Sequence, residues 1–229
     1  MSQLIDNLNT IESIKTDIKA AIENKGVDMT GVSFPGYAGK IGEISGGGGW
    51  DQKSVTEGTI GIINLDNSAS FVASSAFMNN NTIQTVNLPY ATSVGSDAFF
   101  QCNTLKQVSL SVCSYIGESA FAYCQNLNQI SLPVCSYIND RTFYYCYWMK
   151  QVSLPVCSYI GNFAFYNCYQ LSIITIGYSS VCSLYTSNVF QDAGITSSTG
   201  SIYVPTSLVD SYKSAPNWSY FSTQIFPIE

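Results

Sequence analysis

The sequence predicts an α+β solenoid: stacked 22-residue repeats with a parallel sheet along one face, between an N-terminal helix and a small C-terminal cap. Three observations predict this fold. Cysteines recur every eleven residues from position 102 to position 168, which is half of a 22-residue period. One half of each repeat alternates apolar and polar residues, and the other half places a small residue before phenylalanine. A period of about 20 to 29 residues with alternating leucine is the signature of leucine-rich repeats.

The repeats are expected to occupy residues 59–204. Four regular copies begin at Val72, Val94, Ile116 and Ile138, and a fifth begins at Ile160 before departing from the period. A degenerate earlier strand, in TIGIINLDNSAS from residue 59, aligns with TIQTVNLPYATS from residue 82. Since one coil buries its apolar side chains only against neighbouring coils, this periodicity predicts a stack that extends in one direction.

Each repeat divides into two halves. The half L-x-x-V-x-L, as in Leu105 to Leu110, predicts a short strand whose apolar side chains point inward. The half A-F-x-x-C predicts one helical turn on the opposite face. Stacking at about 4.8 Å would then place all the strands in one parallel sheet that presents polar side chains to solvent.

The cysteines are expected to form two ladders inside the stack. No C-x-x-C pair occurs and the chain has no histidine, so neither a metal site nor a cofactor is expected. Free cysteine behaves as a small buried apolar residue. The sequence therefore predicts free structural thiols, with disulfides as the alternative, at Cys102, Cys124, Cys146 and Cys168 in one ladder and Cys113, Cys135 and Cys157 in the other.

Composition excludes several classes of function. Only 10% of residues are charged, and nine Lys and Arg against fifteen Asp and Glu give a net charge of −6, which argues against nucleic acid as a partner. The absence of histidine excludes Ser-His-Asp and Cys-His catalysis. Glu118 and Asp140 share a repeat position, but with Arg141 beside them they are interpreted as solvated charges. We expect no enzyme and no membrane insertion.

The candidate ligand-binding surface follows from the repeat phase. On the sheet face one column holds Gln107, Gln129 and Gln151, beside a second column of Ser109, Ser131 and Ser153; a third column, at the edge, holds Tyr115, Tyr137 and Tyr159. Tyrosine and amide side chains are typical of adaptable recognition surfaces, and the scarcity of charge favours a glycan or a neutral protein surface. Two alternatives remain open: the glutamines bond to one another and the tyrosines pack on the next coil, or the solenoid is a spacer.

The two ends are expected to differ from the repeats. Residues 1–26 form a helix whose apolar stripe either packs on its own domain or makes a coiled coil, with a homotrimer favoured, through Leu4, Leu8, Ile11, Ile18 and Ile22. Residues 27–45 are a small connector, and residues 46–58 are a glycine-rich linker. Residues 205–229 are the C-terminal cap, in which a short helix and apolar residues, including Trp218, Tyr220 and Phe226, cover the open end.

Two segments resemble known families. The repeat A-F-x-x-C-x-x-L-x-x-V-x-L-P, as in AFAYCQNLNQISLP, resembles the BspA-type leucine-rich repeats of bacterial surface adhesins and protist proteins over residues 59–204. That resemblance implies binding to host proteins or matrix. The leader NLNTIESIKTDIKAAIENKGVDMTGVSFPGYAGKI resembles the N-terminal segment of structural proteins of tailed gut bacteriophages, including crAss-like phages, where it precedes fibre or receptor-binding modules.

The resemblances together imply a virion fibre or spike protein. Its expected partners are other virion proteins, through the N-terminus, and a host cell-surface protein or glycan, through the solenoid. The first residues show no signal peptide, so assembly into virions in the bacterial host cytoplasm is expected. The alternative is a leucine-rich-repeat interaction protein outside the virion, or a bacterial adhesin, without catalytic activity.

Overall fold

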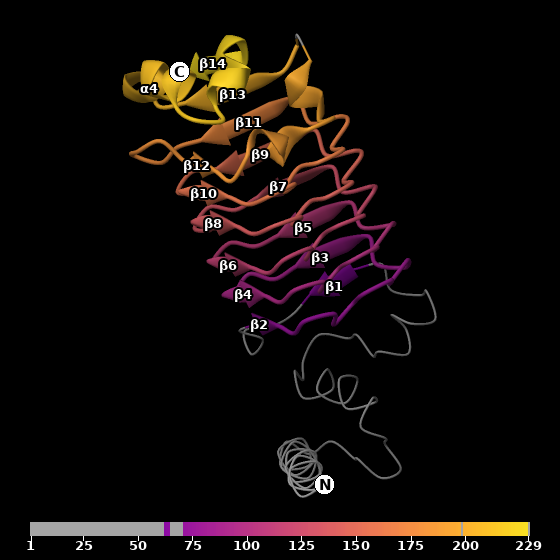
Figure 1. Ribbon diagram of the computed structural model, residues 1–229. Helices are drawn as coiled ribbons and strands as arrows, with labels where there is room; N and C mark the ends of the chain where they lie inside the picture. The colour runs from indigo at the N-terminus through magenta and orange to yellow at the C-terminus, as the bar shows by residue number, and fades with distance from the viewer. Residues whose placement is uncertain (1–61, 65–70, 198, 229) are drawn as a thin grey trace, which may run out of the picture.

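The computed structural model describes residues 62–64, 71–197 and 199–228. Within these residues the chain winds into coils stacked along one axis, and each regular coil contributes a strand to each of two parallel sheets, followed by a turn (Figure 1). The predicted parallel-sheet solenoid is confirmed. The predicted N-terminal helix with its stripe from Leu4 to Ile22, the connector and the glycine-rich linker lie outside the described residues.

The larger sheet, called sheet A, contains eight parallel strands and carries the predicted L-x-x-V-x-L half of each repeat. Gln107 pairs with Gln129, and Gln129 pairs with Gln151, so the register repeats every 22 residues. Neighbours in the sheet are, in order, β1 (Ile62–Asn64), β3 (Thr85–Asn87), β5 (Gln107–Ser109), β7 (Gln129–Ser131), β9 (Gln151–Leu154), β11 (Ile173–Ile176), β13 (Ser201–Val204) and β14 (Ile225–Pro227).

Both ends of the repeat region depart from the 22-residue register. Ile62 pairs with Thr85, which confirms the predicted alignment of the segments from residues 59 and 82. Ile173 pairs with Ser201, so the last regular strand is followed by a longer coil, as the loss of period after the fifth copy predicts.

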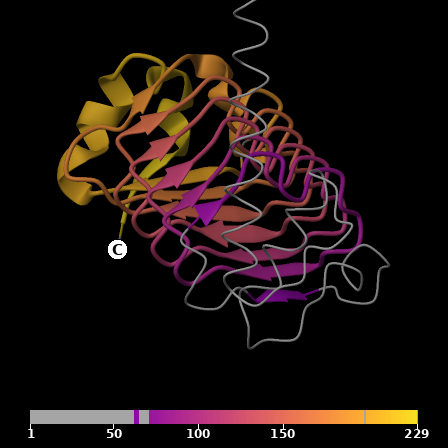
Figure 2. The same cartoon turned by 90° about the horizontal axis from the view of Figure 1, so that it is seen from below.

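A second parallel sheet, called sheet B, corrects the prediction of a single sheet. It contains six strands of two residues: β2 (Phe71–Val72), β4 (Ser93–Val94), β6 (Tyr115–Ile116), β8 (Tyr137–Ile138), β10 (Tyr159–Ile160) and β12 (Ser183–Leu184). Figure 2, which looks along the stack, shows the two sheets as separate faces. Two residues per coil are too few for alternation to be visible in sequence, which is why the period predicted only sheet A.

The A-F-x-x-C half forms a turn, and the predicted helical turn is wrong. Asp97 and Gln101 have left-handed backbone, with φ of 56° and 57°. The N–H groups of Asp97, Phe99 and Gln101 donate to the next coil, to the carbonyls of Glu118, Ala120 and Ala122 at 3.0, 2.8 and 2.9 Å. A helical turn keeps its hydrogen bonds within the segment, whereas this turn sends every second one to its neighbour and so ties the coils together on a third side.

Phenylalanine rings and thiols fill the core. The rings of Phe99, Phe121 and Phe143 are buried and stack with centroids 5.2 and 5.7 Å apart. All eight cysteines are buried free thiols. One ladder donates to phenylalanine carbonyls of the preceding coil, as Cys124 Sγ does to Phe99 O at 3.0 Å, and the other donates to the carbonyl two residues later, as Cys135 Sγ does to Tyr137 O at 3.3 Å.

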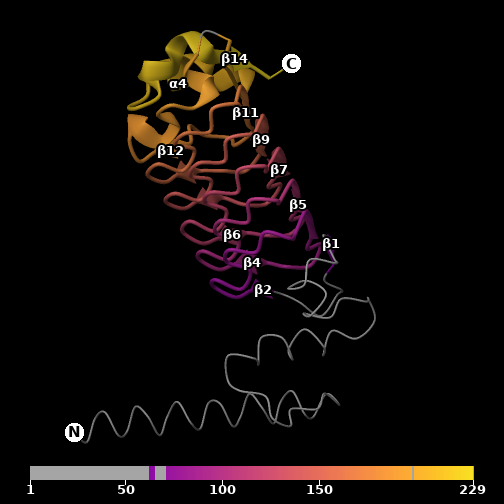
Figure 3. The same cartoon turned by 90° about the vertical axis from the view of Figure 1, so that its right-hand side faces the viewer.

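The C-terminal cap covers the last coil (Figure 3). After two short 3₁₀ helices, η2 (Ser187–Phe190) and η3 (Gly194–Thr196), and strand β13 come η4 (Thr206–Leu208), α4 (Val209–Ser214), η5 (Ser219–Gln224) and strand β14. Trp218 is buried as predicted, but Tyr220 and Phe226 are 74% and 41% exposed. Tyr212 is buried instead. In β14, Ile225 is buried and Phe226 is exposed. None of the helices in the described residues is long and apolar enough to cross a membrane.

Candidate binding surface

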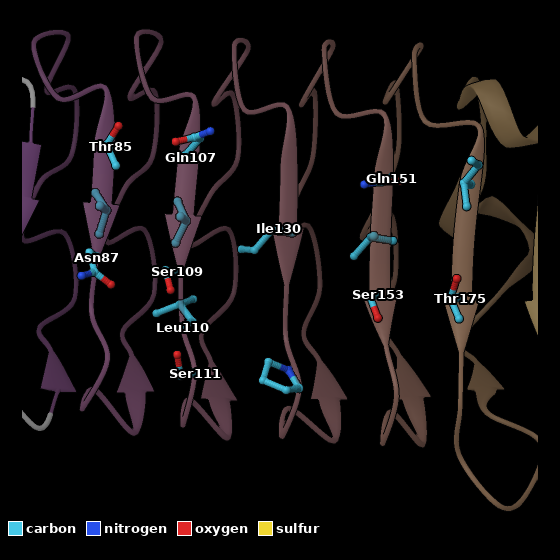
Figure 4. A pocket seen from close by; sticks show the side chains of 15 residues that line it. Thr85, Asn87, Gln107, Ser109, Leu110, Ser111, Ile130, Gln151, Ser153 and Thr175 are labelled. Carbon is cyan, nitrogen blue, oxygen red and sulfur yellow. The ribbon is translucent and has the colours of Figure 1, made fainter.

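A shallow groove of about 650 Å³ lies over the middle of sheet A (Figure 4). It crosses five adjacent strands, from β3 to β11. Among the described residues that line it no side chain is ionisable, and the polar ones are Thr85, Asn87, Gln107, Ser109, Ser111, Gln151, Ser153 and Thr175. The other lining residues are apolar and include Val108, Ile130 and Ile173. The groove is therefore a neutral surface in which amide and hydroxyl groups lie beside apolar side chains.

The glutamine and serine positions predicted from the sequence share this face. In β5, Gln107 and Ser109 are exposed while Val108 between them is buried. The backbone register places Gln129 and Gln151 in line with Gln107. The same register places Ser131 and Ser153 in line with Ser109. Every strand is hydrogen-bonded on both sides here, so the columns are held on a rigid frame.

A second hollow, of about 480 Å³, adjoins the groove where the strands begin. We call it the lysine-tryptophan hollow, and it is lined by Gln84, Thr85, Lys106, Gln107, Asn126, Asn128, Trp148 and Lys150. It shares Thr85 and Gln107 with the groove. Lys106 Nζ donates to Gln84 Oε1 at 3.1 Å, which positions the ammonium group without neutralising it.

The predicted tyrosine column lies on sheet B, apart from the glutamines and serines. Tyr115 and Tyr137 are half exposed, and the rings of Tyr137 and Tyr159 stack with centroids 4.3 Å apart. Burial and a hydrogen bond with Tyr137 raise the pKa of Tyr159 to about 12. The structure therefore corrects the expectation of one sheet face with the tyrosines at its edge: the strand at Tyr115–Ile116 gives the tyrosines a face of their own.

Charged groups do not assemble into a reactive centre in the described part of the chain. Arg141 Nη1 lies 3.2 Å from Glu118 Oε1, and both side chains are about half exposed. Asp140 Oδ1 instead accepts the backbone N–H of Asn162 at 2.7 Å. An exposed ion pair of this kind contributes little to stability. The described residues also contain no group of three His, Cys, Asp or Glu that could hold a metal ion.

Sequence reasoning missed the lysine-tryptophan hollow. A signal was present: Lys106, Asn128 and Lys150 share one phase of the repeat, and Asn126 and Trp148 share another. The glutamine and serine columns were visible because three of the four regular copies repeat them. The lysines and Trp148 vary from copy to copy, so the repeat pattern alone did not select them.

Comparison with known proteins identifies the repeats. The family model described as BspA type leucine rich repeat region matches in six copies, over residues 57–172 and 136–215, which is more than half of the chain. No curated protein matches the sequence.

Three solved structures are similar to this chain. A leucine-rich repeat protein of T. pallidum is 27% identical, with a TM-score of 0.49; the match covers 50% of this chain and 58% of that one. A leucine-rich repeat protein of Bacteroides ovatus is 21% identical, with a TM-score of 0.43, over 54% and 38% of the two chains. The pneumococcal vaccine antigen PcpA is 17% identical, with a TM-score of 0.55, over 74% and 42%, and shares the fold. This chain thus spans under two thirds of each of them.

Proposed function

Because the chain belongs to the BspA-type leucine-rich repeat family, we propose that it is a non-catalytic attachment protein whose sheet A binds the target. The observation that carries this proposal is the neutral groove, in which the amide and hydroxyl columns lie side by side on fully paired strands. Amides and hydroxyls donate and accept hydrogen bonds, as do the hydroxyl groups of glycans and the main chain of proteins. A rigid frame keeps the entropic cost of binding low.

We place this attachment protein in a bacteriophage virion, as a fibre or spike. The support is the leader from residue 7 to residue 41, whose sequence resembles the N-terminal segment of structural proteins of tailed gut phages. In this proposal Leu4, Leu8, Ile11, Ile18 and Ile22 assemble a homotrimer that docks on other virion proteins, and the solenoid carries the host-binding face outward.

Stoichiometry tests the virion setting. Light scattering should give a trimer for the full chain and a monomer after deletion of residues 1–45. A full chain that is monomeric would contradict the fibre proposal and favour a leucine-rich-repeat interaction protein outside the virion.

A pair of matched substitutions tests the binding face. Ser153→Tyr places a bulky ring in the groove, and its column already accommodates Tyr203 on β13. Ser183→Tyr adds the same ring to sheet B, in the column that holds Tyr159. We expect Ser153→Tyr to weaken binding of the labelled full chain to cultured gut bacteria by roughly tenfold or more, since a blocked hot spot costs about 1–2 kcal/mol or more.

Ser183→Tyr is expected to leave attachment unchanged. The reverse pattern would move the binding face to sheet B and the tyrosine column. No effect of either substitution on a folded chain, or no attachment by the wild type, would contradict the proposal that this solenoid binds the host.

A further inference from the structure

We propose that the lysine-tryptophan hollow binds a sugar that carries an anionic group, as one unit of a glycan that continues into the groove. This inference rests on the proposed function, because it names the ligand class for the same face of sheet A. The hollow and the groove share Thr85 and Gln107, so a single extended ligand can occupy both.

The charge of the hollow favours an anion. The described chain contains four Lys and Arg residues; Lys106 and Lys150 line the hollow, and Arg141 is paired with Glu118 elsewhere. No described residue that lines the hollow is acidic. In a chain whose net charge is −6, this local excess of positive charge is a departure from the average surface. Such a patch attracts and orients an anionic ligand.

The spacing of the lysines follows from the strand register. The Asn128 N–H donates to the Lys106 carbonyl at 3.1 Å, and the Lys150 N–H donates to the Asn128 carbonyl at 2.7 Å. The three residues therefore form one column, and the two lysine Cα atoms are about 10 Å apart, which is two strand spacings. Asn128 lies between them and offers both a donor and an acceptor. The hollow thus alternates charge, amide and charge along the stack.

Trp148 supplies an apolar platform. Its side chain is 55% exposed, whereas the cap residue Trp218 is fully buried. The equivalent positions in the neighbouring coils hold Asn126 and Gln170. A pyranose ring has a face of C–H bonds that packs on an aromatic ring and a rim of hydroxyls that needs hydrogen bonds. Indole combines a large contact area with few rotatable bonds, which makes it an efficient anchor.

The surrounding groups favour a glycan over an acidic peptide. The amides of Gln84, Asn126 and Asn128 suit hydroxyl groups, which donate and accept in turn. A peptide that binds by strand addition needs a free sheet edge. Strands β5, β7 and β9 lie inside sheet A with both edges paired, so this route is closed at the hollow.

Calorimetric titration of the full chain tests the inference. The probes are an oligogalacturonate, its carboxyl-reduced form, a sialylated oligosaccharide, a heparin oligosaccharide and poly-glutamate. We expect binding to at least one anionic oligosaccharide, no measurable binding to the carboxyl-reduced form, and weakening as salt rises because the lysines are exposed. The carboxylated and sulfated probes distinguish which anion the hollow prefers.

Each variant introduces the residue that a neighbouring coil has at the equivalent repeat position. Lys106→Asn with Lys150→Asn copies Asn128, and Trp148→Asn copies Asn126, so the coils should fold unchanged, as circular dichroism can verify. Each change should weaken binding by roughly tenfold or more, since each removes a charge-assisted bond or an aromatic anchor. Lys213→Asn, which removes an exposed lysine on α4 outside the hollow, is the control for each single Lys→Asn change and should bind as the wild type does.

Three results would overturn the inference: no anionic oligosaccharide binds, poly-glutamate binds as tightly as the best sugar, or folded Trp148→Asn retains full affinity. Failure of this inference and failure of the proposed function can be told apart. If Ser153→Tyr abolishes attachment to cells while no anionic sugar binds, the groove is the attachment site and the hollow is not an anionic-sugar site. If an anionic sugar binds at the hollow while Ser153→Tyr leaves attachment to cells unchanged, the hollow is a sugar site and the attachment proposal fails.

Discussion

The central coils and the C-terminal cap bury aromatic rings in different ways. In the central coils Phe99, Phe121 and Phe143 stack nearly parallel, with interplanar angles of 3° and 8°. At the cap, Phe190 meets Trp218 at 46° and Phe221 at 86°. A stack built by translation places each ring on an identical ring, while the last ring needs a partner of another shape. The tilted and edge-on contacts of Phe190 end the phenylalanine column, because they leave no parallel ring face on which another coil could stack.

The cap also satisfies the backbone that the last coil leaves open. The Trp218 Nε1 donates to the Cys182 carbonyl, and the Tyr212 hydroxyl accepts the Cys182 N–H at 2.9 Å. Asn217 Nδ2 donates to the carbonyl of Leu184 in β12, the edge strand of sheet B, at 3.1 Å. Sheet A is instead extended by β14. Repeated coils satisfy one another's backbone hydrogen bonds, whereas an end of the stack needs dedicated side chains.

Alkaline pH should produce the largest effect, and it should act on the central coils. Burial raises the pKa of Cys102, Cys135 and Cys168 to about 12 and that of Cys113 to about 11, from 9.0. The folded state therefore binds more protons above pH 9, so stability is full below pH 9 and falls as pH rises toward 12. Each such thiol costs roughly 1.4 kcal/mol per pH unit in that window. Circular dichroism from pH 8 to 12 should show cooperative unfolding.

The control for the alkaline experiment comes from the repeat. Ala91 occupies the ladder position of Cys113 and Cys135 one or two coils earlier. Cys113→Ala with Cys135→Ala should reduce the alkaline loss of stability. An unchanged pH profile in this variant would show that these two thiols do not drive the transition.

Phe121→Ala should be the most damaging single substitution in the central coils. Its ring is fully buried between Phe99 and Phe143, so truncation opens a cavity that neither neighbour can fill. We expect a loss of about 3–5 kcal/mol in the free energy of unfolding, measured by urea denaturation. A loss below about 1 kcal/mol would mean that adjacent coils collapse around the gap.

Trp218→Phe should have a smaller effect, confined to the cap. It keeps an aromatic ring but removes the donor to the Cys182 carbonyl, which costs about 1–3 kcal/mol when the acceptor is left buried and unpaired. Hydrogen exchange should show lost protection at β12 and α4, with β5 and β7 unchanged. Equal loss of protection in all coils would show that the solenoid unfolds as one unit.

Cys124→Ser should have the smallest effect of the series. Cys124 Sγ donates to the Phe99 carbonyl at 3.0 Å, and this acceptor remains in place for a serine hydroxyl. The substitution thus buries a polar group with a partner, which costs about 1 kcal/mol. Thermal or urea unfolding can measure this difference. A loss above about 3 kcal/mol would show that the hydroxyl cannot reach the carbonyl.

Much of the repeat architecture could be predicted from sequence. The 22-residue phase identified the strands at Gln107, Gln129 and Gln151, the alignment of the degenerate first strand, and the inward thiols. The turn could not be predicted correctly, because left-handed residues such as Asp97 and Gln101 are not glycines and carry no compositional mark. The cap contacts could not be predicted either, because Tyr212 and Tyr220 are both tyrosines of one short segment and only packing decides which of them is buried.

The sequence by itself determined the solenoid, its period and the neutral polar character of the strand face, since these depend on local alternation repeated at fixed spacing. Only the tertiary structure decided how the coil bends, and therefore that the tyrosine column lies on sheet B while Lys106, Lys150 and Trp148 meet beside the glutamines on sheet A. The physical reason is that a surface is assembled from neighbouring coils. Residues 22 positions apart become adjacent, and residues 44 apart come within two strand spacings, only when backbone hydrogen bonds between coils set the register and the corners.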